Sequence, residues 1–237
     1  SKLHVVASTG FHKLIFYPTD HWLHSIPVGQ LAKIFISEYR DGMYLDGDFK
    51  LPSKRITAKP GVIKVAADAG GLTPAYRRLF TAAALAAKET GLPLLSHVEG
   101  GKGALEQIAF FLDYGLPPEG LILCHLDRDL SDFAYHCRVA ATGVYLEYDT
   151  IGRFKYHSDE EEAAHIVKMV EAGFKRQILL GLDVTRARMK SYGGSLGLDY
   201  IITSFVPRLK QAGLDDKTIE DLMVKNPALA FQNKSAE

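Results

Sequence analysis

The stretch "GVIKVAADAGG" at residues 61–71 places a lysine inside an apolar, strand-like run that ends at a glycine-rich turn. Side chains alternate along a strand, so Val62, Lys64 and Ala66 share one face. A lysine is almost never fully buried unless it is paired, because its charge is costly to remove from water. Lys64 is therefore either a strand-end cation that reaches water or a lysine with a specific partner. The rest of the chain decides between the two.

Short apolar runs recur along the chain, and amphipathic stretches separate most of them. The expected strands are residues 3–10, 61–67, 92–98, 120–127, 142–149 and 177–184. Strands that alternate with helices predict a parallel sheet, and strands this uniformly apolar are covered on both faces. Six such strands fit either an open doubly wound sheet or most of a (β/α)8 barrel.

Capping signals mark the ends of two expected helices. Thr73 is an N-cap residue followed by Pro74 at the first helical position, and Gly91 ends that helix. Ser158 and Glu161 have the spacing of a capping box. The helix that they begin is expected to stop at Gly173.

The remaining segments bear on domain organisation. The stretch "DDKTIEDLMVKNP" predicts a helix near the C-terminus that ends before Pro227. Residues 40–60 are polar and rich in turn residues, and they predict a long surface loop or small excursion, because strand–helix order resumes after them. We find no internal repeat, and a single α/β domain over residues 1–237 is the expected organisation.

Charge and cysteine content limit the classes of protein. The 28 basic residues balance 28 acidic residues, so the chain has no electrostatic footprint for nucleic acid or an anionic membrane. Two cysteines do not make a disulfide framework. Nothing resembles a signal peptide, and no apolar run is long enough to span a bilayer. We expect a cytoplasmic protein without nucleic-acid or membrane partners.

Residues with metal-ligand chemistry stand at or near the ends of four expected strands, namely Lys64, His97, His125 and Asp183. The carboxyl ends of barrel strands converge on one face, where active sites lie. Imidazole and carboxylate groups are standard zinc or manganese ligands. Each residue alone has a structural explanation, such as a turn or a strand-end cap. Four coincidences at the same end favour a metal site.

Other polar residues carry less weight. Cys124 is expected to be a small buried hydrophobe, because it points to the opposite face from His125. The remaining histidines are interpreted as structural or solvated, namely His4, His21, His24, His136, His157 and His165. The stretch "YGGSLG" at 192–197 lacks the strand-before, helix-after context of a dinucleotide loop. The G-x-S-x-G match at 193–197 lies in this same stretch and also lacks the strand–turn–helix context of a nucleophile elbow, which argues against an open-sheet hydrolase of another family.

Several motifs together resemble the phosphotriesterase family of the amidohydrolase superfamily. They are "GVIKVA", "SHVEGGKGALEQ", "LCHLDRDLSDF", "EYDTIGR" and "LLGLDVTRARMKSYGGSLGLDYIITSFVPRLKQAG", in the family's order from about residue 3 to residue 232. The resemblance points to the phosphotriesterase-homology branch and to lactonases that act on phosphorylated sugar lactones. It implies a (β/α)8 TIM barrel with two divalent metal ions, zinc in the first place and manganese or cobalt as alternatives.

The resemblance also implies roles for individual residues. Lys64 corresponds to an N6-carboxylated lysine that bridges the two metals, His97 and His125 to ligands of one metal, and Asp183 to a ligand of the other. Carboxylation by CO2 needs the neutral amine, which a nearby cation and an apolar site both favour against a reference pKa of about 10.4. The implied reaction is attack by a metal-activated hydroxide, with Asp183 holding the water and carrying a proton to the leaving group.

Basic and phenolic residues follow two of the strands and suit a substrate that bears a phosphate. They are His12, Lys13, Arg186, Arg188, Lys190 and Tyr192. Arginine binds phosphate bidentately, so we expect an anionic small molecule, a phosphorylated sugar lactone or a related ester. The alternative is a non-catalytic or inactive barrel that binds a small ligand at the same rim.

The sequence departs from the family at its beginning, because it has no H-x-H at the end of a first strand. Residues 3–10 align with the third barrel strand, so the first two strands are expected to be missing, in agreement with the start at Ser1. We expect an incomplete metallohydrolase barrel whose edges a further segment or a homodimer partner covers. Lys64, His97 and His125 would still hold one ion. The second ion should bind weakly, so this chain alone is expected to be impaired or inactive.

Overall fold

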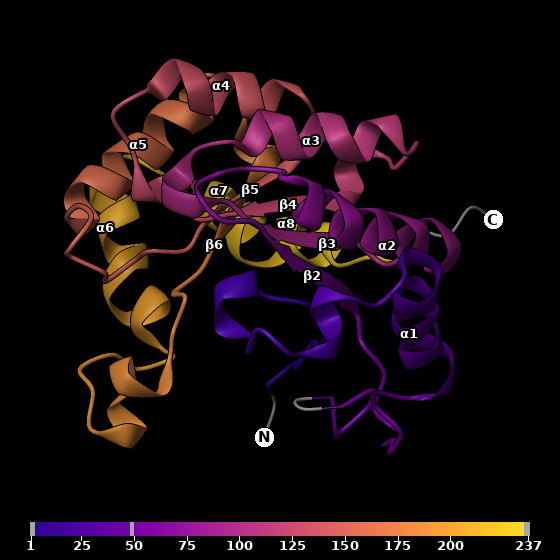
Figure 1. Ribbon diagram of the computed structural model, residues 1–237. Helices are drawn as coiled ribbons and strands as arrows, with labels where there is room; N and C mark the ends of the chain where they lie inside the picture. Colours follow the sequence, from indigo (N-terminus) through magenta and orange to yellow (C-terminus); the bar gives the residue numbers. More distant parts are fainter. Residues whose placement is uncertain (1–2, 48–49, 235–237) are drawn as a thin grey trace. The chain divides into compact units, whose positions relative to one another are not determined.

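The computed structural model describes residues 3–47 and 50–234. Within these ranges strands alternate with helices along the chain (Figure 1). The strands are β1 (Ser8–Gly10), β2 (Val62–Ala66), β3 (Leu94–His97), β4 (Leu121–Cys124), β5 (Tyr145–Tyr148) and β6 (Ile178–Leu180). They follow chain order in one six-stranded sheet, and the β1–β2, β2–β3 and β5–β6 pairs are parallel. Each of the six expected runs contains a strand, with narrower bounds than predicted.

The α-helices of the described ranges are α1 (Val28–Asp41), α2 (Pro74–Thr90), α3 (Ala104–Asp113), α4 (Phe133–Ala141), α5 (Asp159–Glu171), α6 (Val206–Gln211), α7 (Asp216–Glu220) and α8 (Asn226–Ala230). Two π-helical turns, Ile201–Phe205 and Asp221–Lys225, lead into α6 and α8.

By its contacts the chain divides into two compact units. The first comprises Ser1–Glu99, Gly103–Ile122 and Phe231–Glu237, and the second comprises Gly100–Lys102 and Leu123–Ala230. The expectation of one domain over residues 1–237 stays a prediction.

The core of the first unit forms where α1 packs against α2 and where α2 covers β2. Phe80 of α2 is fully buried, and its ring lies 6.0 Å from that of Phe11, 5.9 Å from that of Phe110 and 5.2 Å from that of Phe111, between centroids. Aromatic rings at these separations add favourable contacts to the apolar area that they bury. The cluster holds α2 against its neighbours.

The predicted ends of α2 are confirmed. Pro74 begins the helix, and Gly91 ends it in the left-handed conformation at φ 70°. Thr73 occupies the N-cap position, but its side chain makes no capping hydrogen bond.

The first expected strand is wrong over most of its length. Leu3, Val5 and Val6 are 67%, 86% and 49% exposed, and only Ser8–Gly10 pairs with β2. Since β1 stands at one end of the strand order, its apolar residues have no second strand beside them within the described part of the chain. Apolar character alone therefore did not make this run a buried strand.

The polar segment 40–60 is held by a small set of contacts. Its first two residues belong to α1, and residues 48–49 lie outside the described ranges. Tyr44 and Arg55 form an isolated antiparallel bridge. The Arg55 guanidinium lies 3.8 Å from the centre of the Tyr44 ring and donates a 3.1 Å hydrogen bond to the carbonyl of Ser37 on α1.

In the second unit, the predicted capping box is confirmed at the start of α5. The Ser158 hydroxyl accepts from the Glu161 N–H at 3.2 Å, and the Glu161 carboxylate accepts from the Ser158 N–H at 2.8 Å. The helix ends at Glu171, and Gly173 follows with φ 92°.

The helix expected to end before Pro227 instead continues through it to Ala230. The wider π turn over Asp221–Lys225 comes directly before α8, so the ordinary hydrogen-bond ladder is already interrupted there. Pro227 lies in the first turn of α8, where its missing N–H costs little.

Candidate functional site

Three successive strands of the first unit place His12, Lys64 and His97 near one another. Gly10 of β1 is in register with Lys64 of β2, and Ala66 of β2 is in register with His97 of β3. The His12 and His97 ring centroids are 5.4 Å apart. The structure thus brings a predicted substrate residue next to a predicted metal ligand at the carboxyl ends of parallel strands.

Gly10 makes the close approach of β1 to Lys64 possible. Its φ is 117°, and a Cβ at this position would collide with the Lys64 carbonyl oxygen. The next residue, Phe11, donates its N–H to the same carbonyl at 3.0 Å. A side chain at residue 10 would push Lys64 and its strand away.

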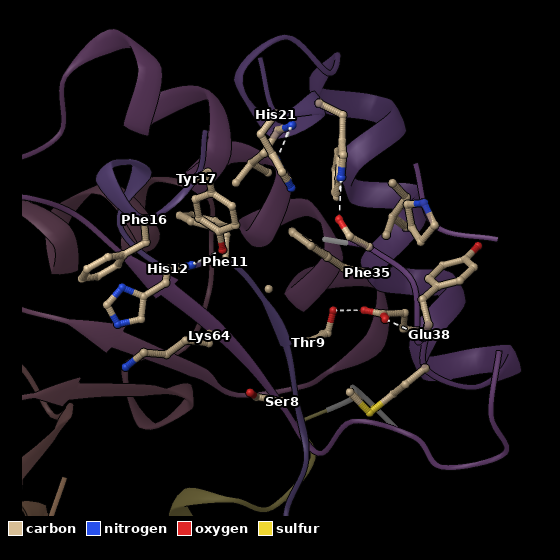
Figure 2. Close-up of a pocket in the computed structure, with 18 of the residues that line it drawn as sticks. Ser8, Thr9, Phe11, His12, Phe16, Tyr17, His21, Phe35, Glu38 and Lys64 are labelled. Carbon is tan, nitrogen blue, oxygen red and sulfur yellow. Dashed lines mark hydrogen bonds between the residues drawn. The ribbon is translucent and has the colours of Figure 1, made fainter. Parts of the chain in front are cut away.

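His12 and Lys64 also line a cavity of about 620 Å³ in the first unit. Figure 2 shows His12 and Lys64 at one side of this cavity and Thr9 and Glu38 at the other. Glu38 is buried, and it accepts hydrogen bonds from the Thr9 hydroxyl and, at 2.9 Å, from the Tyr44 N–H. The cavity is therefore polar on both sides and is large enough for a small molecule.

Glu99, which no sequence motif indicated, connects two predicted site residues. One of its oxygens lies 2.7 Å from the Lys13 ammonium and 2.9 Å from His97 Nε2. Burial acts to raise the pKa of Glu99, but the hydrogen bonds from Lys13 and His97 outweigh it and lower this pKa to about 2. Glu99 thus stays ionised, and the charge of Lys13 is already partly satisfied. Its position two residues after His97 was the available signal.

In the second unit, the backbone is unusual at His125 and Asp183. Among residues 3–47 and 50–234 they are the only non-glycine residues with positive φ, at 67° and 40°. Such conformations are uncommon outside glycine and cost energy, so they persist where the surrounding structure enforces them. Both residues were predicted as metal ligands because of their position after a strand.

The imidazole of His125 is held by Asp149, just after β5. His125 Nδ1 lies 2.7 Å from Asp149 Oδ1, and the His125 N–H donates to Asp149 Oδ2 at 3.2 Å. Both side chains are buried. A carboxylate on one ring nitrogen fixes the tautomer and makes the other nitrogen a better metal ligand. This donor set therefore fits a metal ion at His125.

The Asp183 carboxylate, 30% exposed, is flanked by two arginines that were not among the predicted site residues. Its Oδ2 accepts from Arg128 Nη2 at 3.1 Å and from Arg153 Nη1. Both arginines come shortly after strands, β4 and β5, which was the available signal.

The loop after Asp183 carries the remaining predicted substrate residues. Arg188 donates to the carbonyls of Leu182 at 2.5 Å and Asp183 at 2.9 Å, so its guanidinium holds the turn on which Asp183 stands. Arg186, Lys190 and Tyr192 are exposed, and the Arg186 guanidinium lies 5.6 Å from the centre of the Tyr192 ring.

Two further groups in the second unit have metal-ligand atoms within 4.8 Å of one another. They are Cys124, Glu147 and Asp149, and Asp127, His157 and Glu162. Cys124 is 1% exposed, as expected for a small hydrophobe, but it lies beside two carboxylates. Asp127 and Glu162 are fully buried, and burial raises the pKa of both carboxyl groups.

The four predicted metal ligands are shared between the units, with Lys64 and His97 in the first and His125 and Asp183 in the second. Their assignment as ligands of a common centre stays a prediction. No helix in the described ranges combines the length and the apolar composition that crossing a membrane requires.

Known proteins resemble this chain over nearly its whole length. The chain is 33% identical to a phospho-furanose lactonase from Mycoplasmopsis synoviae, over 97% of this chain and 68% of the relative. A crystal structure of an amidohydrolase from Mycoplasma synoviae has a TM-score of 0.91 and 31% identity, over 98% of this chain and 68% of that one. The phosphotriesterase homology protein from Escherichia coli was crystallised with phosphate in its active site. Its structure has a TM-score of 0.86 and 30% identity, over 97% of this chain and 75% of that one.

A parallel sheet with helices between its strands, and metal-ligand side chains after those strands, define a metal-dependent hydrolase of the (β/α)-barrel class. The model of the phosphotriesterase family matches residues 1–231. This chain belongs to the phosphotriesterase family. The predicted fold class, family and hydrolase activity are confirmed by these similarities.

Proposed function

We propose that this chain hydrolyses a phosphorylated sugar lactone at a binuclear metal centre formed by Lys64, His97, His125 and Asp183. The similarity to a phospho-furanose lactonase supports the reaction. The phosphate in the active site of the Escherichia coli homologue supports an anionic substrate. Zinc is the metal proposed first, with manganese or cobalt as alternatives.

The observation that carries this proposal is the backbone at two ligand positions. His125 and Asp183 have positive φ although neither is glycine, and the surrounding contacts hold each side chain in place. Strained conformations of this kind concentrate at functional sites. An ordinary turn would more readily carry glycine or asparagine there.

Each residue has a chemical role in this proposal. The neutral form of the Lys64 amine adds to CO2 and releases one proton, which gives an anionic carbamate with two oxygens as ligand atoms. His97 and His125 donate ring nitrogens, and Asp149 orients His125. Divalent ions, when bound by these residues, would supply Lewis acidity for the substrate carbonyl and for a water molecule. Asp183 accepts the proton of that water and delivers it to the ring oxygen as the acyl C–O bond breaks.

The substrate's polar groups are assigned to residues on the loops. His12 and Lys13 follow β1, and Arg186, Lys190 and Tyr192 follow Asp183. Arg188 lies on the same loop and is included among the substrate residues. Its guanidinium also donates hydrogen bonds to the backbone carbonyls of Leu182 and Asp183. We also propose a cytoplasmic location. We further propose a homodimer, and sedimentation of the purified protein tests this oligomeric state.

Metal analysis and a lactonase assay test the proposal together. The purified chain should bind one divalent ion tightly and the second weakly, and it should open a phosphorylated furanose lactone at a reduced rate, because the sequence has no H-x-H. His125→Ala and Asp183→Asn should each lose metal and lower kcat/KM by at least about a hundredfold. His4→Ala and Asp113→Asn, which change exposed residues, serve as matched controls. Full metal content in both site variants would refute the ligand assignment, and absence of lactone hydrolysis by the metal-loaded chain would refute the reaction.

A further inference from the structure

Two guanidinium groups in the second unit converge on a single carboxylate oxygen. Arg128 follows β4 and Arg153 follows β5, and both donate to Oδ2 of Asp183. Their side chains are 10% and 21% exposed. Since both bind the same oxygen atom, both lie within reach of one small anion placed there.

A third cation shares an aromatic ring with this pair. Three cations lie over the Tyr156 ring, with Arg128 at 5.4 Å, Arg153 at 5.6 Å and the Lys155 ammonium at 4.6 Å from its centre. Like charges held this close repel one another unless an anion separates them. Asp183 is the carboxylate that contacts both arginines.

The other nearby carboxylates have partners of their own. Asp149 contacts His125, and Asp129 lies 3.2 Å from the Lys102 ammonium. Asp183 is therefore the carboxylate whose direct contacts with both arginines the structure shows. A metal ion on Asp183 would weaken these contacts, because it would draw on the same carboxylate.

Arg128 also carries a donor that nothing satisfies. Its Nε is buried and has no hydrogen-bond partner among the residues that the structure describes. A buried donor without an acceptor is costly, more so when it is charged, so such donors are rare unless a ligand uses them. An anion with several oxygens can accept from Nε and from the Nη groups at once.

We propose that Arg128 and Arg153 form the binding site for the phosphate group of the substrate, which replaces the Asp183 carboxylate on the two guanidiniums. The identity of the substrate rests on the proposed function, whereas the phosphate site does not. A phosphate monoester has the charge and the number of acceptor oxygens that this pair needs, and arginine matches its geometry bidentately. The exchange also frees Asp183 for proton transfer.

Calorimetric titration of the metal-free protein with inorganic phosphate at low ionic strength tests the site. This measurement needs no catalytic turnover. Arg128→Gln and Arg153→Gln should each weaken phosphate binding by about tenfold or more, because each removes a charge-assisted donor. Asp183→Asn should tighten binding by about tenfold, because it removes the carboxylate that competes for the same donors.

Arg138→Gln is the matched control. Arg138 also has a carboxylate partner, Asp132 at 3.5 Å, and a tyrosine ring, Tyr135 at 5.7 Å, but its side chain is 56% exposed on α4. The Arg138→Gln variant should bind phosphate with the affinity of the unaltered protein. Circular dichroism and urea unfolding show that each variant is folded, and Arg153→Lys, which keeps the charge but loses the fork, should give an intermediate affinity.

Two results would overturn the proposal: phosphate affinity unchanged in both glutamine variants, or no gain in affinity in Asp183→Asn. The second would mean that the arginines only anchor Asp183. With lactones, Arg153→Gln should raise KM for the phosphorylated compound and leave KM for its unphosphorylated, uncharged analogue unchanged. If the unaltered protein opens no lactone, the proposed function fails, but the phosphate titrations still decide this site.

Discussion

His125 shows at the scale of one residue how a neighbouring side chain prepares a ligand. Asp149 contacts both the backbone N–H and the Nδ1 of His125, so the imidazole cannot turn freely. The sequence indicated His125 through its place after an apolar run. It did not indicate Asp149, because the two residues are 24 positions apart and come together only through neighbouring strand ends.

Asp149→Asn tests this arrangement. An amide cannot hold the imidazole as a carboxylate does, so we expect metal affinity to fall about 10–100-fold with little change in fold. Competition with a chelator of known affinity measures it, and Asp113→Asn, exposed at the end of α3, is the control. Equal metal affinity in Asp149→Asn and the unaltered protein would contradict the role of Asp149.

Gly10→Ala tests the close approach of β1 to Lys64. The new Cβ would collide with the Lys64 carbonyl at a φ of 117°, and we expect a loss of about 2–4 kcal/mol in the free energy of unfolding. Gly103→Ala is the control, because its φ is 84° but no atom lies within 4 Å of the added Cβ. Its loss should be about 1 kcal/mol, from backbone strain alone. Urea unfolding measures the free energy of unfolding of both variants. Equal losses would show that the backbone around residue 10 shifts enough to remove the collision.

At the scale of elements, local signals located helix ends better than strand ends. The capping box at Ser158 and the glycine at residue 91 act through bonds and conformations within a few residues, so the sequence predicts them directly. The predicted bounds of the first strand were wrong, because strand pairing depends on a neighbouring strand that is far along the chain. The predicted helix end before Pro227 was wrong, because a π turn changes the hydrogen-bond pattern just before this residue.

The anchoring of α2 gives a prediction at this scale. Phe80→Ala removes a fully buried ring from a cluster of four phenylalanines, and we expect it to destabilise the protein by about 3–5 kcal/mol. Leu85→Ala on the same helix, where the side chain is 40% exposed, should cost less than half as much. Thermal or urea unfolding compares the two, and similar losses would show that the cluster does not anchor the helix.

At the scale of the whole molecule, a buried histidine pair ties stability to pH. His165 Nε2 lies 3.1 Å from His136 Nδ1, which in turn lies 2.8 Å from the Tyr148 hydroxyl. Burial, reinforced by the charges of His136, Lys168 and His157, lowers the pKa of His165 to about 3, and burial also lowers the pKa of His136. The folded protein therefore holds these rings neutral where the unfolded chain protonates them.

The expected consequence is a loss of stability in acid. The folded pKa of His165 is below the unfolded value of about 6.5, so its contribution is complete above that pH and is lost as the pH falls towards 3. Urea unfolding at several pH values measures this slope. His165→Leu should show a shallower decline between pH 7 and pH 5 than the unaltered protein, and an equally steep decline would assign the acid sensitivity to other groups.

The sequence by itself determined the order of strands and helices, the capped helix ends, the family and the residue types that follow each strand. These depend on local conformational preference, on apolar periodicity and on motifs that stay contiguous in the chain. Only the tertiary structure decided that Asp149 holds His125, that Glu99 links Lys13 to His97, and that Arg128 and Arg153 meet on Asp183. The physical reason is that charge and hydrogen-bond partners are chosen by distance in space, which folding sets and spacing along the chain does not.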